Sequence, residues 1–402
     1  MFRSAVRRVR FKAWYLLDGL LAITKTATDA DHVLVVRLDA IGDFVLWIDA
    51  AEAIVKYYEA GGKRVSLLAN AVWSDWANDL NIFDRVIPVE RTRFAEDWGY
   101  RYQIARKVRG LRCSIVIQPA YSREFLFGDS IVRMSGALER IGSVGDVSNM
   151  GPSKKRISDR WYTRLIAADP LPRMELQRNA EFVRGLTGAE FPASVPNLRA
   201  FGALGLDPAF IAEMPKGRPY YVIFPGAQWN GRRWPLDHFK AIAELLHEET
   251  GWHGVVGGGP DDGELAASLC RSTATPLLNW AGRTSLPQLA AILSDAQLLL
   301  SNETSAVHIA AAVGLPAICI LGGGHFGRFM PYDVQVRDTR PLPVAVTHSM
   351  PCFGCGWQCI YPIPEGDPKP CVAEITVSQV WAAVRELKGG MNAALARDRD
   401  VN

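Results

Sequence analysis

Short apolar runs alternate with helix-like patterns along almost the whole chain, and this alternation constrains the fold more than any other feature. Runs rich in Val, Ile and Leu that alternate with amphipathic helices predict parallel sheets covered by helices on both faces. The pattern restarts after a Pro- and Gly-rich stretch at 191–219, which we interpret as a linker between two doubly wound α/β domains. The expected strands span 33–37, 65–69, 86–89, 114–118, 220–224, 254–257, 277–280, 297–300 and 317–321. The expected helices include 44–58, 236–250, 286–293 and 305–313.

Each half opens with a strand that runs into a glycine turn, and this predicts where ligands bind. Ligands of doubly wound sheets lie beyond the carboxyl ends of the strands, so two facing domains would hold them in the cleft between them. A length of 402 residues suits two domains of about 150–200 residues each. With 49% hydrophobic and 22% charged residues, the chain is not disordered, collagen-like or a coiled coil. A net charge of +3 excludes a strongly basic nucleic-acid-binding protein.

Residues 1–28 form a basic arm, in which six basic side chains are set against Asp18 alone. Its apolar residues recur at spacings of four and three, which defines one helical stripe. This apolar stripe consists of Phe2, Val6, Val9, Ala13, Leu16 and Leu20. Such a helix either lies on an anionic inner-leaflet membrane surface or docks its stripe on the body of the protein, and the sequence leaves both open. No apolar run reaches the ~18–20 residues of a membrane span, and Asp18 interrupts what would be a signal-peptide core.

The segment 33–43 carries the first candidate for chemistry. A buried strand ends at Arg37, and Gly42-Asp43 lies where a helix begins. Glycine allows close backbone approach and a helix N-terminus favours an anionic group, while Asp43 would project a carboxylate into the cleft. A helix N-cap is the alternative role for Asp43.

The segment 222–235 carries the second candidate. A strand opens into a loop that contains Arg232 and Arg233, and then Trp-Pro begins a helix. Guanidinium groups bind phosphate oxygens bidentately, so this loop suits a diphosphate. A solvated loop is the alternative interpretation.

The segment 301–308 carries the third candidate, a polar turn between a strand and a helix. Backbone N–H groups with the hydroxyls of Thr304 and Ser305 would form a phosphate-binding nest. The Glu303 carboxylate suits ribose hydroxyls, and His308 lies one turn into the helix, where it can face the same ligand. A half-buried structural histidine is the alternative for His308.

Seven cysteines, an odd number in a long chain, argue against a disulfide framework and for the reducing cytoplasm. Four of them lie within twenty residues: Cys352, Cys355, Cys359 and Cys371. Four thiolates can close a tetrahedral site, so the spacing predicts a structural zinc or iron ion, with His348 as a spare ligand. Free thiols or a stray disulfide are the alternatives.

Four segments occur in an order that carries a family resemblance. They are Arg37-Leu-x-x-Ile-Gly-Asp43, Pro225-Gly-Ala…Arg233-Trp-Pro235, Ala281-Gly-Arg-Thr-Ser-Leu286, and the turn before His308-Ile-Ala-Ala-Ala-Val-Gly-Leu-Pro316. Together they resemble glycosyltransferase family 9, the family of ADP-heptose:lipopolysaccharide heptosyltransferases. The resemblance runs from about residue 32 to residue 385, includes the cysteine cluster and leaves the arm outside.

The resemblance implies a GT-B fold, which is two Rossmann-like domains facing across a cleft. It assigns acceptor binding to residues 29–200 and nucleotide-sugar binding to residues 201–388, with a tail at 389–402. It implies an inverting, metal-independent transfer of a heptose from a donor such as ADP-heptose to a lipopolysaccharide-type acceptor, with no cofactor for catalysis. The enzyme would be cytoplasmic, and its arm would hold it peripherally at the inner face of the inner membrane.

The resemblance also implies residue roles. Asp43 stands at the catalytic aspartate, the general base that deprotonates the acceptor hydroxyl. The donor side comprises Arg232, Glu303, Thr304, Ser305 and His308. Many family members have lysine where Arg232 stands, and Asp-Ser/Thr-Gly where this chain has Glu303-Thr304-Ser305.

Two alternative functions remain open from the sequence. A related branch of the family glycosylates autotransporter adhesins and uses cysteine-bound iron, so the cysteine cluster favours a protein acceptor. The departures at Glu303 and Ser305 favour a non-catalytic nucleotide-sugar-binding protein.

Overall fold

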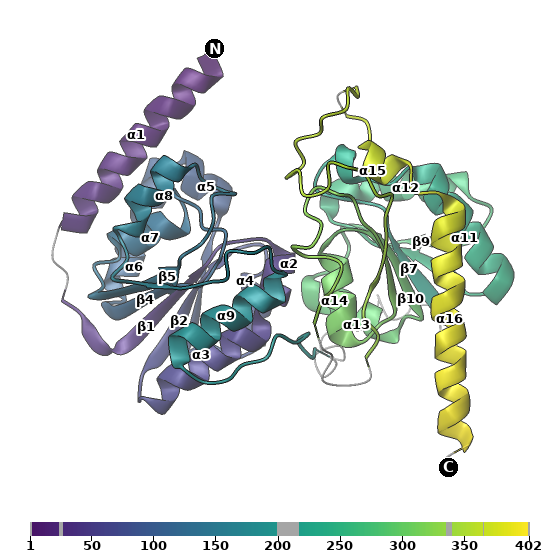
Figure 1. The fold of residues 1–402 in the computed structure, drawn as a ribbon, viewed down its shortest axis with the longest axis horizontal. Helices are drawn as coiled ribbons and strands as arrows, with labels where there is room; N and C mark the ends of the chain where they lie inside the picture. Colours follow the sequence, from purple (N-terminus) through teal and green to yellow (C-terminus); the bar gives the residue numbers. More distant parts are fainter. Residues whose placement is uncertain (1, 24–26, 199–216, 335–339, 365, 401–402) are drawn as a thin grey trace. The chain divides into compact units, whose positions relative to one another are not determined.

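The computed structural model describes residues 2–23, 27–198, 217–334, 340–364 and 366–400. Contacts divide the chain into two compact units, Met1–Ala193 and Ser194–Asn402. Each unit is built around one six-stranded sheet (Figure 1). No helix in these ranges is both long and apolar enough to cross a membrane.

The first sheet is entirely parallel, with strand order β3-β2-β1-β4-β5-β6. Its strands are β1 Asp29–Arg37, β2 Arg64–Asn70, β3 Arg85–Val89, β4 Cys113–Gln118, β5 Glu139–Ser143 and β6 Arg164–Ile166. This is the strand order of a dinucleotide-binding Rossmann sheet. Successive strands are added on one side of β1 up to β3 and on its other side from β4 onward, so the switch point lies between β1 and β4. The carboxyl end of β1 is therefore where a ligand is expected.

The second sheet repeats the same topology, with strand order β12-β11-β10-β7-β8-β9. Its strands are β7 Tyr220–Phe224, β8 His253–Val256, β9 Leu277–Asn279, β10 Leu298–Asn302, β11 Ala317–Ile320 and β12 Val344–Val346. Here the switch point lies between β7 and β10. The loops that follow these two strands are thus the expected ligand-binding region of the second unit.

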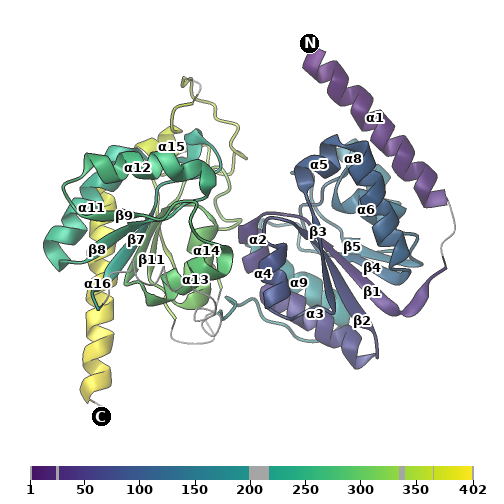
Figure 2. The ribbon, with the colours of Figure 1, turned by 180° about the vertical axis from the view of Figure 1, so that it is seen from behind.

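Helices cover both faces of each sheet, as Figures 1 and 2 show. Those of the first unit are α1 Phe2–Ile23, α2 Ile41–Val45, α3 Ile48–Ala60, α4 Ser74–Asp79, α5 Arg91–Glu96, α6 Trp98–Gly110, α7 Gly128–Met134, α8 Pro152–Asp159 and α9 Glu175–Thr187. Those of the second are α11 Leu236–Thr250, α12 Gly263–Ser272, α13 Leu286–Asp295, α14 Ser305–Val313, α15 Pro370–Ala373 and α16 Val377–Asp400, with short 3-10 helices η2 Asn230–Arg232 and η3 Pro260–Asp262.

The period of strand β1 decides where its last residue points. Leu34 and Val36 belong to one buried cluster with Ile104 and Val108 of α6. Because side chains alternate along a strand, Arg37 lies on the opposite face, which α3 and α9 cover. A charged residue therefore ends a strand whose last six residues are buried, and it points toward α9.

Two helical predictions need correction. The predicted helix 44–58 is two helices, α2 and α3, separated at Leu46 and Trp47. The first of them begins at Ile41, so Asp43 lies inside a five-residue helix and is not its N-cap, which is Ala40.

Helix α1 docks on the first unit, but not through its apolar stripe. Trp14 and Asp18 are buried, whereas Leu16 and Leu20 are 64% and 63% exposed. The Asp18 carboxylate forms a buried ion pair with Arg101 of α6, at 2.6 Å between Oδ2 and Nη2. A docked stripe is therefore wrong for the described side chains, because the pairing of Asp18 rotates the helix. The side chains of Phe2–Phe11 lie outside the described part.

Candidate functional site

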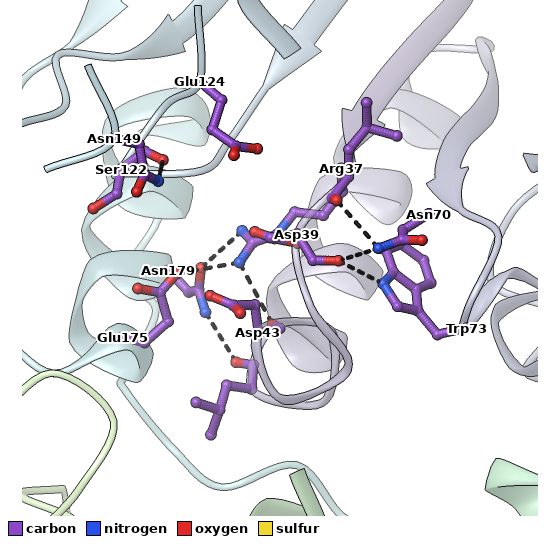
Figure 3. Close-up of polar contacts among 12 residues, drawn as sticks. Arg37, Asp39, Asp43, Asn70, Trp73, Ser122, Glu124, Asn149, Glu175 and Asn179 are labelled. Atoms are coloured by element: carbon purple, nitrogen blue, oxygen red, sulfur yellow. Dashed lines mark hydrogen bonds and ion pairs between the residues drawn. The ribbon is translucent and has the colours of Figure 1, made fainter. Parts of the chain in front are cut away.

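The carboxyl end of β1 holds a buried cation, Arg37, whose side chain is 0% exposed. Its Nε lies 3.0 and 2.8 Å from the two carboxylate oxygens of Asp39. Its Nη2 lies 3.1 Å from Oε1 of Glu175, and its Nη1 donates to Oδ1 of Asn179 at 3.3 Å. Figure 3 shows this guanidinium between the β1 loop and α9. Arg37 thus joins the first strand of the sheet, β1, to the last helix of the unit, α9.

Arg37 also holds the backbone that carries Asp43. Its Nη2 donates to the Asp43 carbonyl oxygen at 3.4 Å. Asn179 adds a second bond to the same turn, from Nδ2 to the Leu46 carbonyl at 3.0 Å. The helix that bears Asp43 is therefore held at two points, by Arg37 of β1 and, at its C-cap residue Leu46, by Asn179 of α9.

The start of the β1 loop is fixed from the other side. The Asp39 carbonyl accepts hydrogen bonds from Nδ2 of Asn70 and Nε1 of Trp73, both at 2.9 Å. The Leu38 carbonyl accepts one from Arg91, which also binds the Glu124 carboxylate with both terminal nitrogens, at 2.8 and 2.9 Å. These bonds hold the segment between β1 and α2 in place.

Burial and the neighbouring charges act in opposite directions on the pKa values of Arg37 and Asp39. Burial alone lowers the pKa of Arg37, but Asp39, Glu175 and Asp43 outweigh it and raise that pKa above its usual value. Burial raises the pKa of Asp39, against the opposing effect of Arg37. The guanidinium of Arg37 therefore stays charged beside the three carboxylates.

The second unit gathers its predicted residues at the ends of β7 and β10. Asn302, the last residue of β10, donates from Nδ2 to the carbonyls of Pro225 and Gly226 at 2.7 and 3.2 Å. Its Oδ1 accepts from the backbone N–H of Trp234 at 3.0 Å. A single buried amide therefore ties the arginine-bearing loop to the turn that precedes α14.

Arg232 and Glu303 form an ion pair in this region, with Nη2 3.0 Å from Oε2 and side chains 13% and 6% exposed. The same nitrogen donates to the Glu303 carbonyl at 3.1 Å. Burial raises the pKa of Glu303, and the neighbouring guanidinium groups of Arg232 and Arg328 oppose that shift. The Glu303 carboxylate is therefore directed at Arg232. Arg233 instead pairs with Asp262 at 3.4 Å.

Helix α14 begins at Ser305, directly after the turn. Thr304 is its N-cap residue, but its side chain makes no capping bond and its hydroxyl lies 3.0 Å from Oγ of Ser301. His308 is buried, and its Nδ1 lies 2.8 Å from the Tyr332 hydroxyl. Burial lowers the pKa of His308 to about 4, so the ring is neutral at pH 7.

The four clustered cysteines line one small pocket together with Trp357 and Lys369. All four are free thiols, and burial raises the pKa of Cys371. As placed, the described residues nowhere form a group of three His, Cys, Asp or Glu side chains that fits a metal ion. His348 lies instead 3.1 Å from Glu374.

Several of these residues were not predicted from the sequence. Glu175 and Asn179 lie 138 and 142 residues after Arg37, and no local pattern links them to the β1 loop. Trp357 lies within the cysteine cluster, where the thiols dominated the prediction. A strand that ends on arginine, directly before a glycine turn, was the one available signal for the Arg37 network.

The chain thus consists of two Rossmann-like α/β units, each with a polar cluster beyond its central strands. Residues 156–352 match the family model of glycosyltransferase family 9 (heptosyltransferase). This match takes in just under half of the chain, so the chain is similar to this family over that part of its length.

Relatives and solved structures agree with the family. Lipopolysaccharide heptosyltransferase 3 of Escherichia coli is 34% identical over 137 residues, which cover 32% of this chain and 39% of that protein. The match thus spans well under two thirds of the curated relative. A glycosyltransferase family 9 structure from Veillonella parvula has a TM-score of 0.64 at 16% identity, covering 90% of this chain and 98% of the other. E. coli heptosyltransferase WaaC with ADP-2-deoxy-2-fluoro heptose has a TM-score of 0.61 at 17% identity, covering 88% and 99%. These two structures share the fold.

Proposed function

We propose that this protein is a glycosyltransferase that moves a heptose from ADP-heptose to a lipopolysaccharide-type glycolipid, with inversion at the anomeric carbon. The family-model match over residues 156–352 supports the reaction class, and the names of the relatives support the two substrates. The observation that carries the proposal is the anchoring of Asp43 beyond the central strand of a Rossmann sheet.

Asp43 acts as the general base in this proposal. Its carboxylate takes the proton of the acceptor hydroxyl while that oxygen attacks the anomeric carbon of the donor. The bond from the anomeric carbon to the diphosphate oxygen breaks on the opposite side, so ADP leaves and the configuration inverts. Arg37 holds the helix that bears Asp43 in place through the Asp43 carbonyl, so that proton transfer needs no rearrangement.

Arg232 and the start of α14 balance the charge of the departing diphosphate. The guanidinium supplies a permanent positive charge, and the amino end of α14 supplies backbone donors with a partial positive charge. The side-chain oxygens of Thr304 and Ser305 lie at this end of the helix. Glu303 orients Arg232, which is a different role from the ribose contact predicted from the sequence. No step requires a metal ion or a cofactor.

The test is incubation of the protein with ADP-heptose and a heptose-deficient lipopolysaccharide acceptor, with mass spectrometry of the glycolipid and chromatography of released ADP. Equal amounts of heptosylated glycolipid and ADP are expected. A glycolipid that stays unmodified while a co-expressed autotransporter gains heptose would replace the proposed acceptor with a protein. Tight ADP binding without transfer to any acceptor would instead favour a non-catalytic binding protein.

We also propose that α1 places the enzyme peripherally at the inner face of the inner membrane. Leu16, Leu20 and Ile23 form an exposed row on the docked helix, with Ile23 78% exposed. The sequence of the same helix contains five of the six basic residues of the arm. Apolar side chains beside basic ones suit the interface of an anionic bilayer.

A structural zinc or iron ion at the four cysteines is a further proposal, supported by their spacing and their shared pocket. The placement of the thiols argues against it, since they form no ligand group. The proposal predicts that elemental analysis of protein purified without chelators finds about one zinc or iron ion per chain. A content well below one per chain of both metals would leave the cysteines as free structural thiols.

A further inference from the structure

The segment that carries the clustered cysteines, which we call the cysteine loop (residues 352–371), is tied to the donor half of the second unit. The backbone N–H groups of Gly354 and Gly356 donate to the carbonyls of Gly323 and Gly324 at 2.7 and 2.9 Å. Lys369 N–H donates to the Gly231 carbonyl at 2.9 Å. The loop is thus fixed both to the segment after β11 and to the loop that bears Arg232.

Trp357 is the side chain that the cysteine loop delivers to this region. It has a φ of 66°, in the left-handed region that favours glycine, so its placement depends on the surrounding contacts. A Cβ at Gly324 would lie 2.2 Å from its ring, so glycine is needed there for the indole to fit. The indole Nε1 donates to Nδ1 of His325 at 3.3 Å, and the edge of Trp229 packs against the ring at 5.7 Å.

The face of the Trp357 ring covers Arg232. The guanidinium carbon lies 4.9 Å from the ring centroid, within the range of a cation–π interaction. Glu303 holds the same guanidinium through Nη2. The Nε of Arg232 is buried and has no hydrogen-bond partner among the described residues, so the ring supplies a contact that hydrogen bonds do not.

We propose that Trp357 is a positioning residue for Arg232: its ring face fixes the guanidinium plane, so that affinity for the donor's diphosphate depends on the cysteine loop. This inference rests on the proposed role of Arg232 in donor binding. Arginine has several rotatable bonds, and a cation held before binding loses less freedom when the diphosphate arrives. The cysteine cluster then contributes to the donor site through packing, without a thiol that touches the substrate.

The test compares Trp357→Phe with Trp357→Leu, which keeps apolar bulk but has no π face. ADP affinity is measured on the full chain by calorimetry, with Trp98→Leu, an exposed tryptophan of the first unit, as the control. We expect Trp357→Leu to weaken ADP binding about tenfold, a loss typical of a desolvated cation–π contact, and Trp357→Phe to weaken it less than threefold. Affinity for adenosine, which has no phosphate, is expected to stay unchanged in both.

A double-mutant cycle with Arg232→Met isolates the coupling. Trp357→Leu is expected to have no further effect on ADP binding once Arg232 is replaced. The positioning role would be overturned if Trp357→Leu weakened ADP binding equally in both backgrounds. It would also be overturned if Trp357→Leu and Trp357→Phe weakened ADP binding by the same factor. If Arg232→Met binds ADP like the wild type, or the wild type binds no ADP, the donor-site assignment fails together with the inference. Normal ADP binding with the expected cycle but no heptose transfer would overturn the proposed function alone.

Discussion

Burial sets the charge of single residues at the second site. His308 lies in an apolar helix whose residues from Ala306 to Val313 are all buried, and this environment disfavours the imidazolium form. Glu303 is similarly buried, but Arg232 compensates its charge. Sequence reasoning placed both residues in the same turn, yet it gave no information about their burial, because burial depends on Tyr332 and on the cysteine loop.

The pKa of His308 predicts a pH dependence of stability. Its pKa falls from 6.5 to about 4 on folding, so the unfolded chain binds a proton below pH 6.5 that the folded chain refuses. The contribution of neutral His308 to the free energy of unfolding is therefore fully present above pH 6.5. It is lost as the pH falls toward 4, by up to about 3 kcal/mol. Urea unfolding at pH 7.0 and 4.5 is expected to show a smaller loss in His308→Asn than in the wild type. Equal losses in the two proteins would contradict the shift.

The Arg37 network shows which residue-level features a sequence conceals. The motif Arg37-Leu-x-x-Ile-Gly-Asp43 was visible and indicated Asp43. The partners Glu175 and Asn179 come from a helix that enters the layer much later in the chain, so only the folded topology brings them to Arg37.

At the scale of elements, the long apolar runs were predictable, whereas two of the short edge strands, β6 and β12, were not. The strand β7 and the helices α11 and α14 have the bounds that their patterns predicted. The strands β6 and β12 have three residues each and lie at sheet edges, where neither length nor apolar periodicity is informative. Their pairing is decided by the neighbouring strands.

The orientation of α1 was missed for a different reason. The Trp14 ring and the Asp18 carboxylate lie against the buried Arg101, which also bonds Ser130. Leaving this cation unpaired would cost about 3–5 kcal/mol, more than the burial of one leucine gains. The pair therefore decides which face docks.

The exposed row on α1, made of Leu16, Leu20 and Ile23, predicts that the protein binds membranes through this helix. Glu substitution of both Leu16 and Leu20 is expected to abolish most flotation with anionic liposomes, because each leucine contributes about 1.5–3 kcal/mol on burial. Leu138→Glu, at a 71% exposed site elsewhere in the first unit, serves as the control. Full flotation of the double variant would contradict a membrane role for this row. Deletion of the arm is a poorer test, since it orphans Arg101.

At the scale of the whole molecule, the chain repeats one topology twice, and each copy carries a different polar cluster. Both sheets have the Rossmann order, and each places its polar cluster beyond its central strands. The first cluster surrounds a carboxylate that suits a general base, and the second surrounds an arginine that suits a diphosphate. The overall charge of +3 describes neither cluster, because most of the excess is in the arm.

The central claim is that Asp43 is the base for glycosyl transfer. Asp43→Asn keeps the size of the side chain but removes its basicity, whereas Asp79→Asn removes an exposed carboxylate of the same unit. Initial rates of ADP release from ADP-heptose with a glycolipid acceptor measure the effect directly. We predict that kcat falls about 10²–10⁴-fold in Asp43→Asn while its affinity for ADP stays unchanged. The kcat of the control variant Asp79→Asn is expected to equal that of the wild type. A turnover rate of Asp43→Asn within twofold of the wild type would contradict the claim.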